Sequence, residues 1–280
     1  MSLLSVSNLS VRDVRNDEVL VKNIDFEVEA HTCLGIVGES GSGKSVVCKS
    51  LLGLANPWLA VKGRVNFDGL NLLTAESEIL RQIRGKRICM ILQDVMTAFD
   101  PLYTIGEQLI ETLCESTKHN KKSAEAAIIE ALDNMYIHDP AIVLKKYAHQ
   151  LSGGMLQRCM LALAFILKPD IIIADEPTTA LDFINQREVV EAFQRLREHI
   201  GTAVIFISHD IGIVQYLAQQ VLVMRNGEQI EYGSAKQVFN NPQHEYTRHL
   251  VDARIALTKS FREAMRKSFE EIHVRSKRCL

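Results

Sequence analysis

The stretch Gly38-Glu-Ser-Gly-Ser-Gly-Lys-Ser45 decides the fold, because it matches G-x-x-x-x-G-K-S/T and follows the apolar run from Cys33 to Val37. Glycines let the backbone curl so that successive N–H groups point at a phosphate, and a helix starting here adds its positive end. Lys44 supplies a charge to the β- and γ-phosphates, and the Ser45 hydroxyl can ligate Mg²⁺. The stretch predicts a nucleotide site made by Gly38, Glu39, Ser40, Gly41, Ser42, Gly43, Lys44, Ser45 and Val46.

A second motif, Ile171-Ile-Ile-Ala-Asp175-Glu176-Pro177, is an apolar strand that ends in two carboxylates. Residues at the carboxyl end of a strand in an open parallel sheet face the ligand crevice. Asp175 is placed to hold Mg²⁺ and Glu176 to polarise an attacking water as a general base. Either motif alone could be a turn or a solvated acidic loop, but the two together predict nucleotide hydrolysis.

The remaining apolar pattern predicts an α/β fold. Short, wholly apolar runs are typical of strands buried on both faces of a parallel sheet, and here they recur at Ile88–Leu92, Ala203–Ile207 and Val221–Met224. Two alternating segments, Leu3–Val11 and Val19–Val28, predict an antiparallel edge. Helical spacing between Pro101 and Gln150 predicts a helical subdomain at roughly 95–160, inserted between two strands.

The composition is that of a folded chain, with 280 residues, 47% of them apolar and 24% charged. A formal net charge of −2 gives no basic field for nucleic acid.

The start lacks a signal peptide, and no apolar run approaches the roughly 18 residues that span a bilayer, so we expect any membrane role to act through a partner. Scattered cysteines without a CxxC pair predict reduced thiols and a cytosolic protein: Cys33, Cys48, Cys89, Cys114, Cys159 and Cys279.

The segment Leu151-Ser-Gly-Gly-Met-Leu-Gln-Arg158 resembles the signature motif of ATP-binding-cassette (ABC) proteins. Ser152, Gly153 and Gly154 open a helix, whose dipole and free N–H groups make a second anion site. The resemblance implies that this site, with Gln157, contacts the γ-phosphate of ATP bound to an opposite subunit. The family resemblance covers roughly residues 3 to 250. It implies the cassette fold of P-loop NTPases and a dimer with two ATPs sandwiched at its interface.

Three further residues match the family's pattern. Gln93 matches the Q-loop glutamine, which senses Mg²⁺ and the attacking water; Asp182 matches the D-loop, which crosses between subunits; His209 matches the switch histidine. The resemblance implies that Glu176, His209 and Gln93 are catalytic, with ATP and Mg²⁺ as cofactors. It implies that the Mg²⁺ ligands are Ser45, Gln93 and Asp175.

The sequence departs from the family at the adenine subsite. Family members often stack adenine on an aromatic residue near the end of the first strand, yet Val11-Arg-Asp-Val-Arg15 contains none. Arg12 and Arg15 are the candidates to stack on the base instead.

Several segments resemble the importer branch that handles peptides and nickel, namely Met96-Thr-Ala-Phe-Asp-Pro101, Met155 in the signature, and Asn241-Pro-Gln-His-Glu-Tyr-Thr-Arg248. Within it the chain is most similar to the D-type ATP-binding subunits for nickel or chelated metal. The resemblance implies an ATPase that drives import of nickel or a related metal chelate. The alternatives are a di- or oligopeptide importer and a cassette ATPase that acts on nucleic acid or ribosomes without transport.

The resemblance implies partners and a location. We expect residues 1–253 to form the ATP-binding domain and 254–280 a basic tail, either a docked or frayed helix or a contact to membrane or partner. The partners would be a second cassette ATPase, homologous or identical, and two transmembrane permease subunits, with an extracytoplasmic binding protein acting indirectly and no nucleic acid. The chain would sit peripherally on the cytoplasmic face of the cell membrane.

Overall fold

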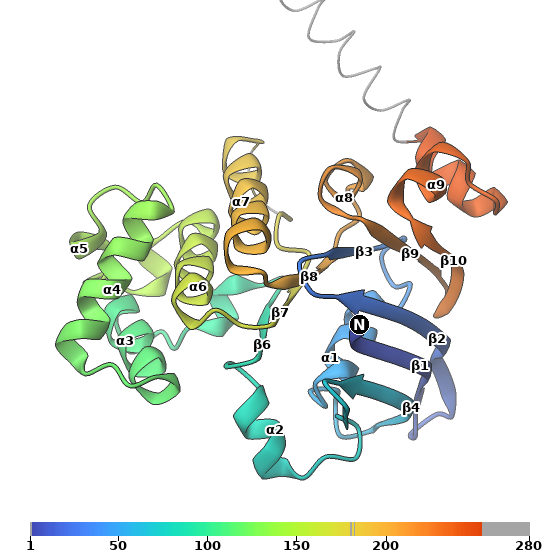
Figure 1. Cartoon of the computed structure of the whole chain (residues 1–280), viewed down its shortest axis with the longest axis horizontal. Coiled ribbons are helices and arrows are strands. Elements are labelled where there is room, and N and C mark those ends of the chain that lie inside the picture. The colour runs from blue at the N-terminus through green and yellow to red at the C-terminus, as the bar shows by residue number, and fades with distance from the viewer. Residues whose placement is uncertain (1, 180, 182, 254–280) are drawn as a thin grey trace, which may run out of the picture.

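The phosphate loop connects a buried strand to a helix, as predicted. In the computed structural model, which describes residues 2–179, 181 and 183–253, β3 (Cys33–Val37) leads into this loop and α1 (Lys44–Leu51) follows it (Figure 1). Every residue of β3 is buried, which fits its wholly apolar sequence. The loop therefore lies at the carboxyl end of a central strand.

The predicted parallel core is confirmed. β3 pairs in parallel with β8 (Ala203–Ile207) on one side and with β9 (Gln220–Arg225) on the other. The parallel arrangement continues from β8 to β7 (Ile171–Asp175) and from β7 to β6 (Ile88–Ile91). The carboxyl ends of β3, β6, β7 and β8 therefore meet at one edge, which places the segments that follow them close together.

The antiparallel edge is also confirmed, and it is larger than the sequence suggested. β1 (Ser2–Asp13) pairs with β2 (Glu18–Glu29) and with β4 (Leu59–Phe67), which continues to β5 (Leu70–Asn71). β10 (Glu228–Ser234) is antiparallel to β9 and bridges to β2 in parallel. Within the described residues one sheet results, in the order β5-β4-β1-β2-β10-β9-β3-β8-β7-β6. Strands β4, β5 and β10 were not predicted from the sequence.

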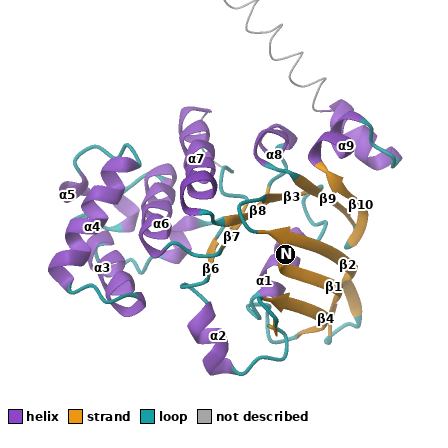
Figure 2. Ribbon diagram, viewed as in Figure 1, coloured by secondary structure: helices purple, strands orange, loops and turns teal. Residues whose placement is uncertain are grey.

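Helices fill the chain between β6 and β7, where the insertion was expected. They gather at one end of the molecule, beside the edge strand β6 (Figures 1 and 2). Thr104 caps the first long helix in a reciprocal capping box with Glu107, which fixes where that helix starts. The elements are η1 (Val95–Ala98), α3 (Ile105–Ser116), α4 (Lys121–Asn134), α5 (Pro140–Val143), η2 (Ala148–Gln150) and α6 (Gly153–Leu167).

Two hydrophobic clusters cover the two faces of the sheet. One joins the helical insertion to the core, with Phe193 and Phe206 in edge-to-face contact at 5.3 Å between ring centroids. The other packs α1 against the antiparallel strands and includes Phe26 and Phe67. The remaining helices are α2 (Ser77–Ile83), α7 (Phe183–Arg195), η3 (Leu196–Ile200), α8 (Ile211–Leu217), α9 (Ala235–Asn240) and a helical segment at 245–253.

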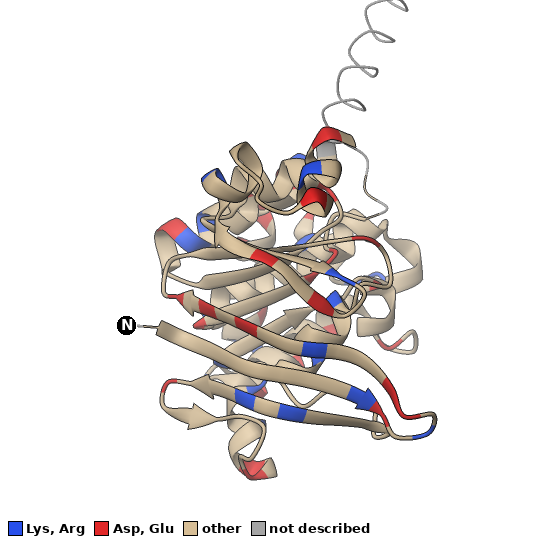
Figure 3. Ribbon diagram, turned by 90° about the vertical axis from the view of Figure 1, so that its right-hand side faces the viewer, with Lys and Arg blue, Asp and Glu red and all other residues tan. Residues whose placement is uncertain are grey.

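Two surface features bear on the predicted partners. On the antiparallel strands that face the viewer in Figure 3, acidic residues predominate on β2 and β10, whereas β4 carries basic residues. No helix in the described ranges is long and apolar enough to cross a bilayer. The predicted tail, residues 254–280, lies outside the described residues.

Candidate functional site

A cavity of about 510 Å³ brings nine of the predicted site residues together. It is lined by residues of the phosphate loop and of the segments at the ends of β6, β7 and β8. The cavity size is within the usual range of small-molecule sites, roughly 300–1,000 Å³. Leu20 on β2 was not predicted. The lining residues are Leu20, Ser40, Gly41, Gly43, Lys44, Ser45, Val46, Gln93, Glu176 and His209.

The phosphate loop is held in shape by Lys44, whose ammonium donates to the carbonyl oxygens of Gly38 and Glu39 at 2.9 and 2.8 Å. Burial lowers the pKa of Lys44, while the nearby carboxylates Glu176, Asp175 and Glu39 oppose that shift. Gly43, which precedes α1, has φ +95°, and a Cβ there would lie 3.2 Å from the carbonyl oxygen of Leu20. The loop conformation therefore requires glycine here.

Two of the proposed Mg²⁺ donors are in contact, and the third lines the same cavity as Ser45. The Ser45 hydroxyl donates to Asp175 Oδ1 at 2.9 Å, and Gln93 lines the same cavity. Burial raises the pKa of Asp175, and its bond to Ser45 opposes the shift. Hydroxyl, carboxylate and amide oxygens are hard ligands that suit Mg²⁺ beside nucleotide phosphates. Among the described residues no cluster of three or more His, Cys, Asp or Glu could hold a metal ion by itself.

Glu176 has a strained backbone and a fixed side chain. Its φ is +48°, in the left-handed region that non-glycine residues rarely adopt and that often marks functional sites. Its backbone N–H donates to the Ile207 carbonyl at 3.1 Å, which ties the end of β7 to β8. Glu176 Oε2 accepts from the Thr179 hydroxyl at 2.9 Å and lies 3.3 Å from His209 Nδ1. The contact from Thr179 was not predicted from the sequence, although its position three residues after the predicted general base was a local signal.

The signature residues lie apart from the chain's own phosphate loop. Ser152 caps α6 by accepting the Met155 N–H at 3.3 Å, and Ser152 and Gly153 are exposed, whereas Gly154 and Gln157 are buried. No lining residue of the 510 Å³ cavity comes from 152–157. The structure therefore does not combine the two predicted anion sites within one chain. Asp182 lies outside the described residues.

Of the two arginines considered for the adenine subsite, only Arg15 has a planar partner. Its guanidinium lies 4.6 Å from the centroid of the Trp58 ring and pairs with the buried Asp13. Arg12 instead forms an exposed ion pair with Asp17 at 2.7 Å. Neither arginine lines the phosphate-loop cavity, and stacking of Arg12 or Arg15 on adenine stays a prediction.

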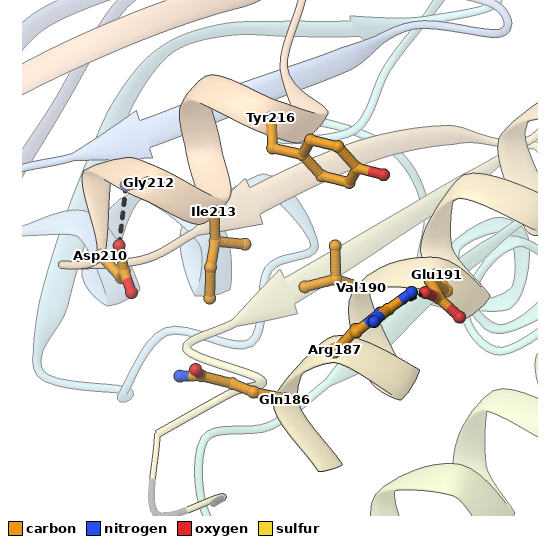
Figure 4. A pocket seen from close by; sticks show the side chains of 8 residues that line it. All are labelled: Gln186, Arg187, Val190, Glu191, Asp210, Gly212, Ile213 and Tyr216. Atoms are coloured by element: carbon orange, nitrogen blue, oxygen red, sulfur yellow. Dashed lines mark hydrogen bonds and ion pairs between the residues drawn. The ribbon is translucent and has the colours of Figure 1, made fainter. Parts of the chain in front are cut away.

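A second cavity, of about 450 Å³, lies between α7 and α8 (Figure 4). Asp210 caps α8 by accepting the Gly212 N–H at 2.7 Å, so this wall of the cavity begins directly after His209. Val190 and Ile213 supply apolar surface, and Arg187 pairs with Glu191 along α7. This cavity shares no lining residue with the phosphate-loop cavity.

Comparison with known proteins supports the same interpretation. The ABC transporter family model matches residues 21–179. The metal-staphylopine import system ATP-binding protein CntD of Staphylococcus aureus is 44% identical over 266 residues, covering 95% of this chain and 98% of that protein. The dipeptide transport ATP-binding protein DppD of Lactococcus lactis is 42% identical, covering 90% of this chain and 73% of that protein.

Solved structures confirm the fold. A dimeric ATP-binding cassette in a post-hydrolysis state, bound to ADP and Pi, superposes with a TM-score of 0.74 at 24% identity, over 83% of this chain and 98% of that one. Cassette cbiO1 of Clostridium perfringens superposes with a TM-score of 0.71 at 23% identity, over 94% and 99%. By fold, motif and sequence, the chain belongs to the ABC transporter family.

Proposed function

We propose that this chain is the ATP-hydrolysing subunit of an importer, and that the importer carries nickel or a related metal in chelated form. The observation that carries the ATPase assignment is the single cavity in which Lys44, Gln93, Glu176 and His209 meet. A phosphate loop, a general base and a sensor in one cavity are the parts that phosphoryl transfer to water requires.

The geometry supports the following chemistry. Glu176 accepts a proton from water while that water attacks the γ-phosphorus, the bond between γ-phosphorus and the bridging oxygen breaks, and ADP and phosphate result. Lys44 and the loop N–H groups offset the charge on the phosphate oxygens. The bond between His209 Nδ1 and Glu176 needs the proton on Nδ1, because a carboxylate only accepts, so His209 orients the base.

Mg²⁺ fits the cluster of Ser45, Asp175 and Gln93, which would hold it. When bound, the ion neutralises charge on the β- and γ-phosphate oxygens. Asp175 is only 3% exposed and bonded to Ser45, so both side chains are positioned before any ion arrives.

We further propose that two cassette subunits, this chain with a homologue or with itself, share the ATP sites. Ser152 and Gly153 are exposed at the start of α6 and are absent from the cavity wall of their own chain. A second subunit placing its α6 terminus over the cavity would supply the missing anion contacts. We assign residues 1–253 to this ATP-binding domain, with the helices near 95–160 as its helical subdomain.

Exposed apolar side chains next to the sensor support a permease contact. Met96, Leu102 and Tyr103 follow Gln93 within ten residues and are 40%, 79% and 54% exposed. Apolar surface gathered in one short segment is typical of a protein interface. We propose that two membrane permeases bind here, which would hold the chain at the cytoplasmic face of the membrane, and that an extracytoplasmic binding protein delivers the cargo.

The assignment of the cargo rests on similarity to the metal-staphylopine import protein, which is 44% identical to this chain. The dipeptide protein and the oligopeptide transport ATP-binding protein OppD of Haemophilus influenzae are 42% and 41% identical. Identities of 41–44% among all three keep peptide import as the second candidate.

Uptake of labelled cargo tests both candidates in one experiment. Cells lacking this chain receive either the wild type or Lys44→Ala, and accumulate labelled nickel, with and without a metallophore, or a labelled dipeptide. Rescue of metal uptake by the wild type alone supports the proposal. Rescue of dipeptide uptake alone moves the cargo to peptides, and rescue by Lys44→Ala contradicts an ATP-driven step.

A further inference from the structure

A tyrosine near the carboxyl end of the described chain reaches into the phosphate loop. Tyr246 lies in the helical segment 245–253 and its hydroxyl accepts the backbone N–H of Glu39 at 3.2 Å. The side chain is 4% exposed, and the Arg225 guanidinium stacks 4.6 Å from its ring centroid. Because the family model ends at residue 179, this contact comes from a part of the chain that the family comparison does not include.

The contact completes a clamp on one peptide group. The N–H of Glu39 and the carbonyl of Gly38 belong to the same planar unit, so their directions are coupled. Lys44 Nζ donates to that carbonyl at 2.9 Å, while Tyr246 holds the N–H on the opposite side. The hydroxyl of Tyr246 therefore helps to aim the carbonyl that holds the phosphate-binding lysine.

The clamped peptide is adjacent to a residue with unusual freedom. Gly38 has φ +155°, and a Cβ there would lie 2.2 Å from the Met224 carbonyl oxygen. Only glycine fits at this position, and because it has no side chain, its backbone torsions are less restricted. A peptide group next to glycine rotates more readily than one between bulkier residues. Its orientation must come from outside contacts, which Lys44 and Tyr246 provide.

Tyr246 is itself anchored to the sheet. Glu231 on β10 accepts the backbone N–H groups of Gln243 and His244 at 3.0 and 3.2 Å. His244 Nδ1 then accepts the N–H of Tyr246 at 3.1 Å, which caps the helical segment. Burial raises the pKa of Tyr246, so the hydroxyl stays neutral at physiological pH. The clamp is thus held by a chain of contacts from β10.

We propose that Tyr246 is a positioning residue for nucleotide binding: its hydroxyl fixes the Gly38–Glu39 peptide so that Lys44 stays at the phosphate-binding position. The inference rests on the proposed function in requiring that the wild type binds ATP. It adds to that function a role for the segment after the cassette core.

Replacing only the hydroxyl tests the clamp. Tyr246→Phe keeps the ring, its burial and the stack with Arg225. We expect the Kd for ATP, measured on the full chain with EDTA present to prevent hydrolysis, to rise about 2- to 10-fold, the usual effect of one hydrogen bond. In the reconstituted complex the KM for ATP should rise while kcat stays near the wild-type value.

Tyr232→Phe is a matched control. The Tyr232 hydroxyl also accepts a backbone N–H at 3.2 Å, from Glu27, but Tyr232 lines a different cavity that shares no lining residue with the phosphate-loop cavity. We expect its Kd for ATP to equal that of the wild type. Hydrogen exchange of the nucleotide-free chain gives a second measurement, in which Tyr246→Phe should speed exchange of the Glu39 amide and Tyr232→Phe should not.

The outcomes separate this inference from the ATPase proposal. A wild type that does not bind ATP overturns the proposed function. A wild type that binds ATP, with an unchanged Kd and unchanged Glu39 exchange in Tyr246→Phe, overturns only the clamp. An equal rise in Kd for both tyrosine variants also overturns the clamp, because it would indicate general loosening of the fold.

Discussion

Glu176 combines a left-handed backbone with hydrogen bonds that leave it little freedom. Its side chain is held by Thr179 and His209, and its backbone N–H donates to Ile207 on β8. Neighbours on β8 and in the segments after β7 and β8 therefore hold the strained residue in place. Strain of this kind costs on the order of 1–3 kcal/mol and persists only where surrounding contacts over-determine the conformation. Its occurrence at the proposed general base is consistent with selection for a fixed carboxylate.

Replacement of the base should separate binding from hydrolysis. Glu176→Gln removes proton acceptance but keeps the shape and the bond from Thr179, so we expect the Kd for ATP to stay near the wild-type value and kcat to fall about 10²- to 10⁴-fold. Equilibrium nucleotide binding measures the Kd, and phosphate release by the reconstituted complex measures kcat. Glu191→Gln, on the exposed face of α7, should keep wild-type turnover. Wild-type turnover in Glu176→Gln would exclude the general-base role.

Asp175 should be a site where function opposes stability. Burial raises its pKa above that of an unfolded aspartate, so the folded chain binds the proton more readily and loses stability as the pH rises through that window. At neutral pH Asp175 is ionised, and the buried charge lowers the free energy of unfolding by its full amount. Asp175→Asn should therefore raise the Tm of the nucleotide-free chain by a few degrees, since about 1 kcal/mol corresponds to roughly 2–4 °C at this size.

The gain in Tm should shrink as the pH falls, because wild-type Asp175 then takes up its own proton. Thermal unfolding at neutral and mildly acidic pH measures this, and the variant should lose Mg²⁺-dependent hydrolysis. Asp170→Asn is the control. Asp170 precedes the same strand, but its side chain is 40% exposed and paired with Arg87, so loss of its charge should not raise Tm. If the Tm of Asp175→Asn at neutral pH were lower than that of the wild type, the buried charge of Asp175 would not be destabilising.

The connection from β6 into the helical insertion is the element that we propose joins the hydrolysis site to a permease partner. Gln93 is exposed in the cavity, η1 follows within two residues, and Phe99 and Ile105 are buried in the cluster that contains α6. A displacement at Gln93 would therefore be transmitted to packed helices rather than absorbed by a free loop.

A charge in the exposed part of that connection should uncouple transport from hydrolysis. Leu102→Asp places a carboxylate where we propose a permease contact, so uptake should fall at least about tenfold while ATP binding by the isolated chain stays unchanged. The control is Ile142→Asp, at an equally apolar and 56% exposed position on α5 of the same insertion. Normal uptake with Leu102→Asp, or equal losses in both variants, would refute the proposed location of the interface.

At the scale of the whole molecule, one sheet joins distant parts of the chain, but it does not bring the two anion sites together. The phosphate loop follows the central strand β3, whereas the signature residues start α6 in the helical insertion (Figure 1). We propose that the exposed α6 terminus of one subunit lies over the phosphate-loop cavity of the other. Two such subunits placed head to tail would complete two sites.

Dimer formation should depend on the start of α6. A Cβ at Gly153 would meet no atom within 4 Å, and an acidic residue in the first turn favours a helix, so Gly153→Glu should fold normally. Its charge would repel the phosphates of ATP on the opposite subunit. In a Glu176→Gln background with ATP, we expect a dimer by light scattering, weakened at least about tenfold by Gly153→Glu. Thr112→Arg, exposed on α3, should leave it intact.

The sequence by itself was enough to predict the parts of the fold and site that depend on local pattern. The buried runs that became β3, β6, β7, β8 and β9 follow from hydrophobicity, and the phosphate loop follows from its glycines and lysine. Chain order then placed Gln93, Glu176 and His209 after parallel strands, whose carboxyl ends must meet at one edge.

Only the tertiary structure decided the contacts between distant segments. The strands β4 and β10 carry weak apolar patterns and are defined by pairing with β1 and β9. Tyr246 looks like an ordinary aromatic of a C-terminal helix, yet folding carries it 207 positions back to Glu39. No local periodicity encodes such a contact, because it exists only once the sheet order has brought β10 and the phosphate loop together.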